Sequence, residues 1–199
     1  LHLCHHNLEK MGTDKIDSGK LLAEVCMAAY YEGQSIKTHY PKYQRTYEGS
    51  GFTLCTMLAR SFADIGDIIR GKDLFYGNKQ EKEKRDELDK KLKEVFGNIY
   101  EELKKDRTNG QKSAKEYYKD DGGDFFQLRE DWWDANRETV WKAITCGAHG
   151  SYFHATCGSG KSATRAKDNC RCPETSDGKA GEVNIDPPTY FDYVPQYLR

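Results

Sequence analysis

The chain has 199 residues, of which 32% are charged and 37% hydrophobic, and its formal net charge is −1. This balance excludes a generally basic nucleic-acid binder, although it allows a local basic patch. No apolar run approaches the roughly 18 residues of a transmembrane helix. The aromatic share of 12% favours helices with thin apolar stripes and large aromatic anchors over a hydrophobic parallel sheet.

The first predicted helix spans residues 19–32, with Ser18 as its N-cap and Gly33 as its stop. Its apolar residues recur on one face. Residues 34–51 contain Pro41 and end in Gly-Ser-Gly, so they are predicted to form a loop that can hold a short helical turn.

The second predicted helix, residues 52–70, is the centre of the chain. Its apolar residues follow helical spacing, and Gly71 is the predicted helix stop. Its polar side carries opposite charges three or four residues apart: Arg60, Asp64, Asp67 and Arg70. Periodicity alone leaves two interpretations open, a solvated polar face or charges that pin neighbouring helices.

Two further helices are predicted, over residues 79–107 and 125–145. The first is highly charged, and Gly97 is predicted to bend or break it. Residues 108–123 between them form a polar surface loop. Asp124 is the predicted cap of the last helix, whose three tryptophans are expected to be buried against the central helix.

Seven cysteines indicate disulfides and an oxidising compartment, and their odd number leaves one without a partner. Cys4 is the expected odd one. We expect the chain to be a fragment of a larger extracellular protein, because it starts without Met. Residues 146–188 lack periodicity, so disulfides are expected to order them. The candidates are Cys26, Cys55, Cys146, Cys157, Cys170 and Cys172.

We expect the disulfides to tie residues 146–172 to themselves and to the helices that bear Cys26 and Cys55. Cys170 and Cys172 are expected to have different partners, because a bridge over so short a loop is strained.

No motif predicts catalysis, a cofactor or a metal. The Gly-Ser-Gly-Lys-Ser run after Cys157 fails as a phosphate loop, because Ala155 replaces the first glycine and no strand precedes it. Zinc is a minor alternative for Cys146, His149 and the later cysteines, whose spacing matches no common zinc site. Asp120, Asp121 and Asp124 lack the ligand pattern of a calcium loop, and no nucleophile is paired with a base.

Two basic segments are candidates for binding sulfated glycans, because guanidinium and ammonium groups pair with sulfate as they do with phosphate. The first is acid-free and rich in tyrosine, and it contributes Lys37, Lys42 and Arg45. The second contributes Lys161, Arg165 and Lys167. The alternative is that both segments are ordinary solvated loops.

Three blocks resemble the alpha class of Duffy-binding-like domains from the variant erythrocyte membrane protein 1 family of the malaria parasite. The first is Ala-Arg-Ser-Phe-Ala-Asp-Ile-Gly-Asp-Ile-Ile-Arg-Gly-Lys-Asp-Leu-Phe at 59–75, and the second is Leu-Arg-Glu-Asp-Trp-Trp-Asp-Ala-Asn-Arg-Glu-Thr-Val-Trp-Lys-Ala-Ile-Thr-Cys at 128–146. The third region comprises Tyr152-Phe, Cys170-Arg-Cys and Asp-Tyr-Val-Pro-Gln-Tyr-Leu-Arg at 192–199. Residues 1–8 resemble the family's turn into its second subdomain.

The resemblance implies an all-α, disulfide-stapled helical bundle with long loops, of which residues 1–199 are mainly the second subdomain. It implies a receptor-binding adhesion module on the infected erythrocyte surface, active in cytoadherence, rosetting and antigenic variation, and not an enzyme. Expected partners are heparan sulfate and other glycans, protein receptors such as complement receptor on erythrocytes or endothelium, neighbouring domains and antibodies, without nucleic acid. The alternative is a scaffold subdomain whose contacts are made elsewhere.

The resemblance also favours one interpretation of the central helix, because the hallmark block contains its charged residues. Arg60, Asp64, Asp67 and Arg70 are then expected to be buried or half-buried architectural groups.

Overall fold

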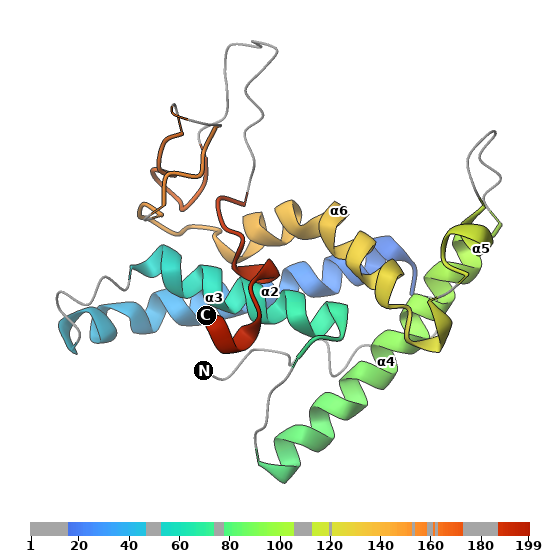
Figure 1. The fold of residues 1–199 in the computed structure, drawn as a ribbon. Helices are drawn as coiled ribbons and strands as arrows, with labels where there is room; N and C mark the ends of the chain where they lie inside the picture. The colour runs from blue at the N-terminus through green and yellow to red at the C-terminus, as the bar shows by residue number, and fades with distance from the viewer. Residues whose placement is uncertain are drawn as a thin grey trace.

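The computed structural model describes residues 16–46, 53–73, 78–105, 113–119, 121–152, 154–158, 161, 163–172 and 187–199. Its long helices are α2 (Ser18–Thr46), α3 (Leu54–Arg70), α4 (Lys79–Leu103) and α6 (Phe126–Ile144). The short elements are α5 (Ala114–Tyr117) and the 3₁₀ turns η1 (Gly122–Asp124), η3 (Phe191–Tyr193) and η4 (Gln196–Leu198). α6 packs against both α2 and α3 (Figure 1). Two isolated β-bridges and no sheet occur in these residues, which confirms the all-α fold class.

α3 is the buried centre of the bundle, as its apolar stripe predicts. Thr53 caps its start by accepting a hydrogen bond from the Thr56 amide at 3.2 Å. Gly71 ends the helix with φ of 72°, and its amide donates to the carbonyl of Ile68 at 3.2 Å. The predicted helix and its glycine stop are therefore confirmed.

α2 continues through Gly33 to Thr46. The predicted stop at Gly33 is therefore wrong, and so is the predicted loop over residues 34–51 as far as Thr46. Residues 47–51 lie outside the described residues. Gly33 serves close packing, since a Cβ on it would lie 2.9 Å from the carbonyl carbon of Ile144 in α6 and overlap the oxygen. Pro41 lies near the exposed end of α2, where water can satisfy the carbonyl that loses its amide partner.

Buried tryptophans join α6 to its neighbours. The ring centroids of Trp133 and Trp141 lie 5.1 and 5.2 Å from that of Phe62 in α3. Trp132 instead contacts Phe96 of α4 edge-on, with 6.0 Å between centroids. The expected burial is confirmed, and two of the three rings pack on the central helix.

The start of α6 differs from the prediction, because Asp124 does not cap it. Phe125 precedes the helix in a left-handed conformation with φ of 54°. The carboxylate of Asp121 reaches across this turn and accepts the amides of Gln127 and Leu128 at 2.7 and 3.0 Å. Asp124 instead forms an ion pair with Lys93 of α4.

α4 is continuous through Gly97, so the helix is not broken there. Its buried stripe comprises Leu88, Leu92, Val95, Phe96 and Ile99. The predicted loop before α6 contains α5 and η1 in its described part. One half of α4 stands away from the other helices (Figure 1).

Two segments without an α-helix complete the described chain. Residues 146–172 are closed by disulfides, and residues 187–199 lie on α3 and α6 through η3 (Figure 1). The C-terminal segment contains the 3₁₀ turns η3 and η4.

Candidate functional site

The charged side of α3 is largely buried. Asp67 and Arg70 are only 4% and 2% exposed, and a 2.9 Å hydrogen bond joins Oδ1 of the first to Nη2 of the second. Arg60 and Asp64 are half-buried. A solvated face is therefore excluded for the centre of this row.

The C-terminal segment supplies the countercharge to this row. Nη1 of Arg199 lies 2.9 Å from Oδ1 of Asp64, and its Nη2 donates to Asp67. Burial raises the pKa of Asp64 and of Asp67, and this effect outweighs the lowering by Arg199. Arg70 also donates to the main-chain carbonyl of Asp192. The row thus joins α3 to residues 192–199.

A second buried charge cluster joins α6 to the same segment. The Asp192 carboxylate is 1% exposed and accepts two hydrogen bonds of 2.8 Å from Arg137. Trp133 donates a third, at 2.9 Å. Arg137 also donates to the carbonyl of Thr189 at 2.8 Å. Each polar group in this cluster therefore has a partner, as buried charges require.

A third buried cation holds the end of α3. Arg129 donates from Nε to the carbonyl of Ile69 at 2.6 Å and from Nη2 to that of Ile68 at 3.0 Å, and it pairs with Asp89 of α4. A cation at these carbonyls also complements the helix dipole.

Sequence reasoning missed four members of these clusters, namely Arg129, Arg137, Asp192 and Arg199. A signal existed for Arg137, which lies four residues from both Trp133 and Trp141 and so shares their buried helix face. The two C-terminal residues had no local signal, because their partners are more than 50 residues away.

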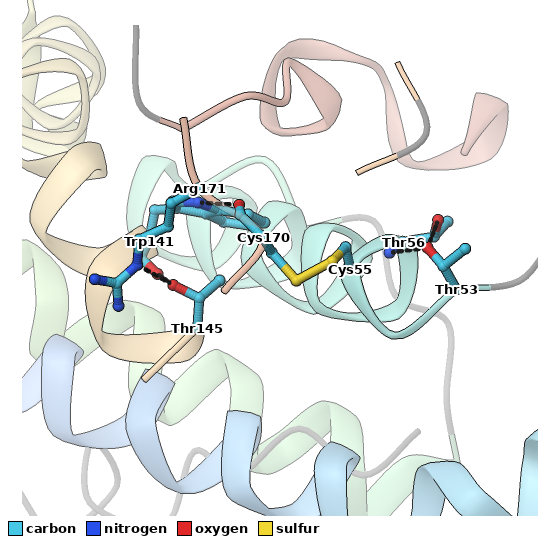
Figure 2. Close-up of a disulfide and its surroundings, with 7 residues drawn as sticks. All are labelled: Thr53, Cys55, Thr56, Trp141, Thr145, Cys170 and Arg171. Carbon is cyan, nitrogen blue, oxygen red and sulfur yellow. Dashed lines mark hydrogen bonds between the residues drawn. A yellow bond between two sulfur atoms is a disulfide. The ribbon is translucent and has the colours of Figure 1, made fainter. Parts of the chain in front are cut away.

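One disulfide fastens the segment 146–172 to the bundle. Cys55 of α3 bonds to Cys170, whose carbonyl accepts a hydrogen bond from Trp141 at 3.2 Å (Figure 2). The neighbouring Arg171 donates to the hydroxyl of Thr145 at 2.8 Å. It also donates to a carbonyl in the last turn of α6. Both α3 and α6 therefore anchor this end of the segment.

The second disulfide, Cys157–Cys172, closes a loop that we call the cationic loop, residues 157–172. The prediction that Cys170 and Cys172 have different partners is confirmed. The loop contains all three basic candidates of the second segment, and each is exposed: Lys161, Arg165 and Lys167. Asp168 is its one acid.

The first basic segment is helical. Lys37 is half-buried and donates to the carbonyl of Cys146, so it already fastens α2 to the end of α6. Lys42 is exposed on α2, and the side chain of Arg45 lies outside the described residues. The structure therefore does not bring the two basic segments together through their cations, and it gives Lys37 an internal partner.

Two candidate cysteines are free thiols, so their predicted place in disulfides is corrected. Cys26 is half-buried on α2, and Cys146 is exposed after α6. α2 and α6 run parallel, since Ser18 contacts Trp132 and Gly33 contacts Ile144. Cys26 lies two helical turns before the Gly33 contact and Cys146 lies just after it, so the two thiols are apart. Cys4 lies outside the described residues.

Among the described residues, no group of His, Cys, Asp or Glu could hold a metal ion. Three cysteines of the zinc alternative are in disulfides and cannot act as thiolate ligands. None of the described helices is both long and apolar enough to cross a membrane.

Solved structures similar to this chain are domains of PfEMP1. The NTS-DBL1(alpha-1) domain of Plasmodium falciparum membrane protein 1 (PfEMP1) from the varO strain matches with 38% identity and a TM-score of 0.67, over 99% of this chain and 40% of that one. The ICAM-1-binding PfEMP1 IT4var13 DBLbeta domain matches with 28% identity and a TM-score of 0.63, over 100% of this chain and 39% of that one. The structure of the PfEMP1 IT4var13 DBLbeta domain bound to ICAM-1 matches with 29% identity and a TM-score of 0.62, over 99% of this chain and 40% of that one.

The chain thus spans about two fifths of each of these three solved chains. No curated protein matches it. The model of the Duffy binding domain matches residues 1–199, the whole chain. With this match and 38% identity to a DBL1-alpha domain, the chain belongs to the Duffy binding domain family.

Proposed function

We propose that this chain is part of an adhesion module that binds host receptors at the surface of the infected erythrocyte, with the cationic loop as its contact for sulfated glycans such as heparan sulfate. Cytoadherence, rosetting and antigenic variation are the roles proposed for it. Other proposed partners are protein receptors on erythrocytes or endothelium, neighbouring domains and antibodies. The similar DBLbeta domain bound to ICAM-1 supports receptor binding as the general role.

One observation carries the glycan assignment, the concentration of exposed cations inside the Cys157–Cys172 loop. Lys161, Arg165 and Lys167 are exposed, and Asp168 is the one acid between the two cysteines. Guanidinium and ammonium groups donate to sulfate oxygens, and a dense row of sulfates gains from several cations at once.

The anchoring of this loop supports the proposal, because a pre-ordered site loses less entropy on binding. The Tyr152 amide donates to the carbonyl of Ala166 at 3.0 Å, and the Cys170 amide donates to that of Gly150 at 3.2 Å. These contacts use main-chain atoms, so the exposed cationic side chains remain outside the anchoring contacts.

The test measures binding of heparin as a function of salt concentration. Three exposed ion pairs at roughly 0.5 kcal/mol each make about 1.5 kcal/mol, so replacing all three cations with alanine should weaken binding about tenfold at low salt. The salt dependence should also flatten. The variant carries K161A, R165A and K167A.

A matched control removes three exposed lysines from α4, namely K82A, K84A and K90A. It changes the net charge equally and should leave most of the heparin binding intact. If both variants lose heparin binding equally, the binding reflects non-specific charge, and the assignment of the cationic loop is wrong.

A second candidate function is a scaffold subdomain whose receptor contacts are made by other parts of the protein. The partial coverage of the solved domains favours it, since about three fifths of each lies outside the match. Binding by the 199-residue chain alone would contradict it.

A further inference from the structure

The outer side of α2 combines exposed apolar residues with a stretch that has no exposed acid. Met27, Tyr30 and Tyr31 are 49%, 40% and 52% exposed. The two tyrosine rings pack edge to face with 5.6 Å between their centroids. The opposite side of the helix packs on α3 and α6.

This apolar cluster continues into a cationic part of the same helix. A row of exposed residues one or two helical turns apart runs along the outer side of α2: Met27, Tyr31, Thr38 and Lys42. It spans about 22 Å, since each helical residue rises 1.5 Å. We call this row, together with Tyr30, the α2 face.

From Met27 to Gln44 the exposed side chains of α2 carry no negative charge. Acids make up 32 of the 199 residues, yet the only acid between Met27 and Thr46 is Glu32. Glu32 is 3% exposed and accepts a hydrogen bond from Ser61 inside the bundle at 3.1 Å. The described exposed sides of α4 and α6, by contrast, carry acids such as Glu94 and Glu138.

We propose that the α2 face is a second interaction surface, which docks a protein receptor that presents an apolar patch bordered by acidic side chains. The inference rests on the proposed receptor-binding function and adds a surface that is separate from the cationic loop. Tyrosine and methionine are enriched at protein–protein interfaces, where aromatic anchors contribute most of the affinity. A sulfated glycan gains little from Met27 or the tyrosine rings, so the apolar part of the face favours a protein.

The test uses the 199-residue chain on erythrocytes and on endothelial cells, each untreated, treated with heparinase or treated with trypsin. The double variant M27A/Y31A and the variant K42E should each bind heparinase-treated cells about tenfold more weakly than the wild type, as expected for loss of interface anchors. Trypsin should remove the component of binding that these variants affect.

Matched controls are Y117A on α5 and K90E on α4, both at exposed positions. They should bind like the wild type, and all variants should retain the wild-type melting temperature. Size-exclusion chromatography accompanies each sample.

Wild-type binding to heparinase-treated cells by both α2 variants would overturn the inference while leaving the proposed function standing. If the variants also bind trypsin-treated cells more weakly than the wild type, the α2 face binds a glycan or lipid. If the wild type is a dimer and M27A/Y31A is a monomer, the α2 face binds a second copy of the chain. Either result overturns the inference. A wild-type chain that binds none of the cells would contradict the proposed function itself, and the inference with it.

Discussion

Arg137 and Asp192 lie 55 residues apart in the sequence, and two hydrogen bonds of 2.8 Å join them inside the fold. Both side chains are almost completely buried, at 8% and 0% exposure. This pair holds the C-terminal segment on α6 through one carboxylate, which also accepts the indole N–H of Trp133. Removing one partner of such a pair strongly lowers the stability of the fold, because the other charge then stays buried without a counterion.

The first prediction concerns that carboxylate. Asp192→Ala should lower the free energy of unfolding by about 3–5 kcal/mol, since it leaves the Arg137 guanidinium buried without a counterion. Urea denaturation measures the change. Asp86→Ala, at an exposed position on α4, should stay within about 0.5 kcal/mol of the wild type. A loss below about 1 kcal/mol for the Asp192 variant would contradict the role given to the pair.

The second prediction compares two helical glycines. Gly33→Ala should destabilise the protein by about 1–3 kcal/mol, because its Cβ would overlap the carbonyl of Ile144. Gly97→Ala should stabilise it by up to about 1 kcal/mol, because its Cβ would lie 3.6 Å from the Phe125 ring, an ordinary contact, and alanine favours the helix. Thermal unfolding of the two variants tests both signs, and equal shifts would refute the explanation for the continuous α2.

The third prediction concerns pH and Asp64. Burial raises its pKa in the folded state, so the folded protein binds this proton more tightly than the unfolded chain. The stabilising contribution of the carboxyl is therefore complete below the unfolded pKa of about 3.9 and is lost as the pH rises through the folded value. Asp64→Asn carries a neutral group at every pH.

The stability of the wild type minus that of Asp64→Asn should accordingly be larger at pH 5 than at pH 7.5. Urea denaturation at the two pH values gives this difference, and Asp86→Asn on the exposed side of α4 serves as the control. The opposite order would mean that pairing with Arg199 outweighs burial.

The fourth prediction concerns the two free thiols. Burial raises the pKa of Cys26, so less of it is the reactive thiolate, whereas Cys146 is exposed. Iodoacetamide at pH 8 should therefore modify Cys146 faster than Cys26 in the folded protein, as followed by peptide mass spectrometry. Similar rates in urea would show that the fold causes the difference, and an unmodified Cys146 found in a disulfide would contradict its assignment as free.

Much of the bundle follows from local pattern. Apolar spacing and the stop at Gly71 determine α3, and the charged row on that helix was correctly singled out. Gly33 was misread because its purpose, close approach to Ile144, depends on a helix more than 100 residues away. The local sequence does not distinguish a glycine at a helix–helix contact from a glycine that ends a helix. Only the packing of the folded chain distinguishes them.

The candidate site was less predictable for the same physical reason. Exposed cations can be found from composition, but the internal partner of Lys37 is a main-chain carbonyl supplied by Cys146, which carries no sequence signal. Ion pairs such as Arg199 with Asp64 likewise depend on how distant segments meet. Residue type predicts that a charge needs a partner, whereas the fold decides which one it finds.

The anchoring of the cationic loop has an evolutionary consequence. The Cys157–Cys172 disulfide closes the loop, and the Cys55–Cys170 disulfide attaches it to α3. Its described attachments also include the side-chain bond from Arg171 to Thr145 and the bond from Trp141 to the main-chain carbonyl of Cys170 (Figure 2). Exposed positions such as 161, 165 and 167 take no part in them. Mutations there can change the exposed chemistry of the loop while the bundle keeps its fold, so this loop can diversify under selection at little loss of stability.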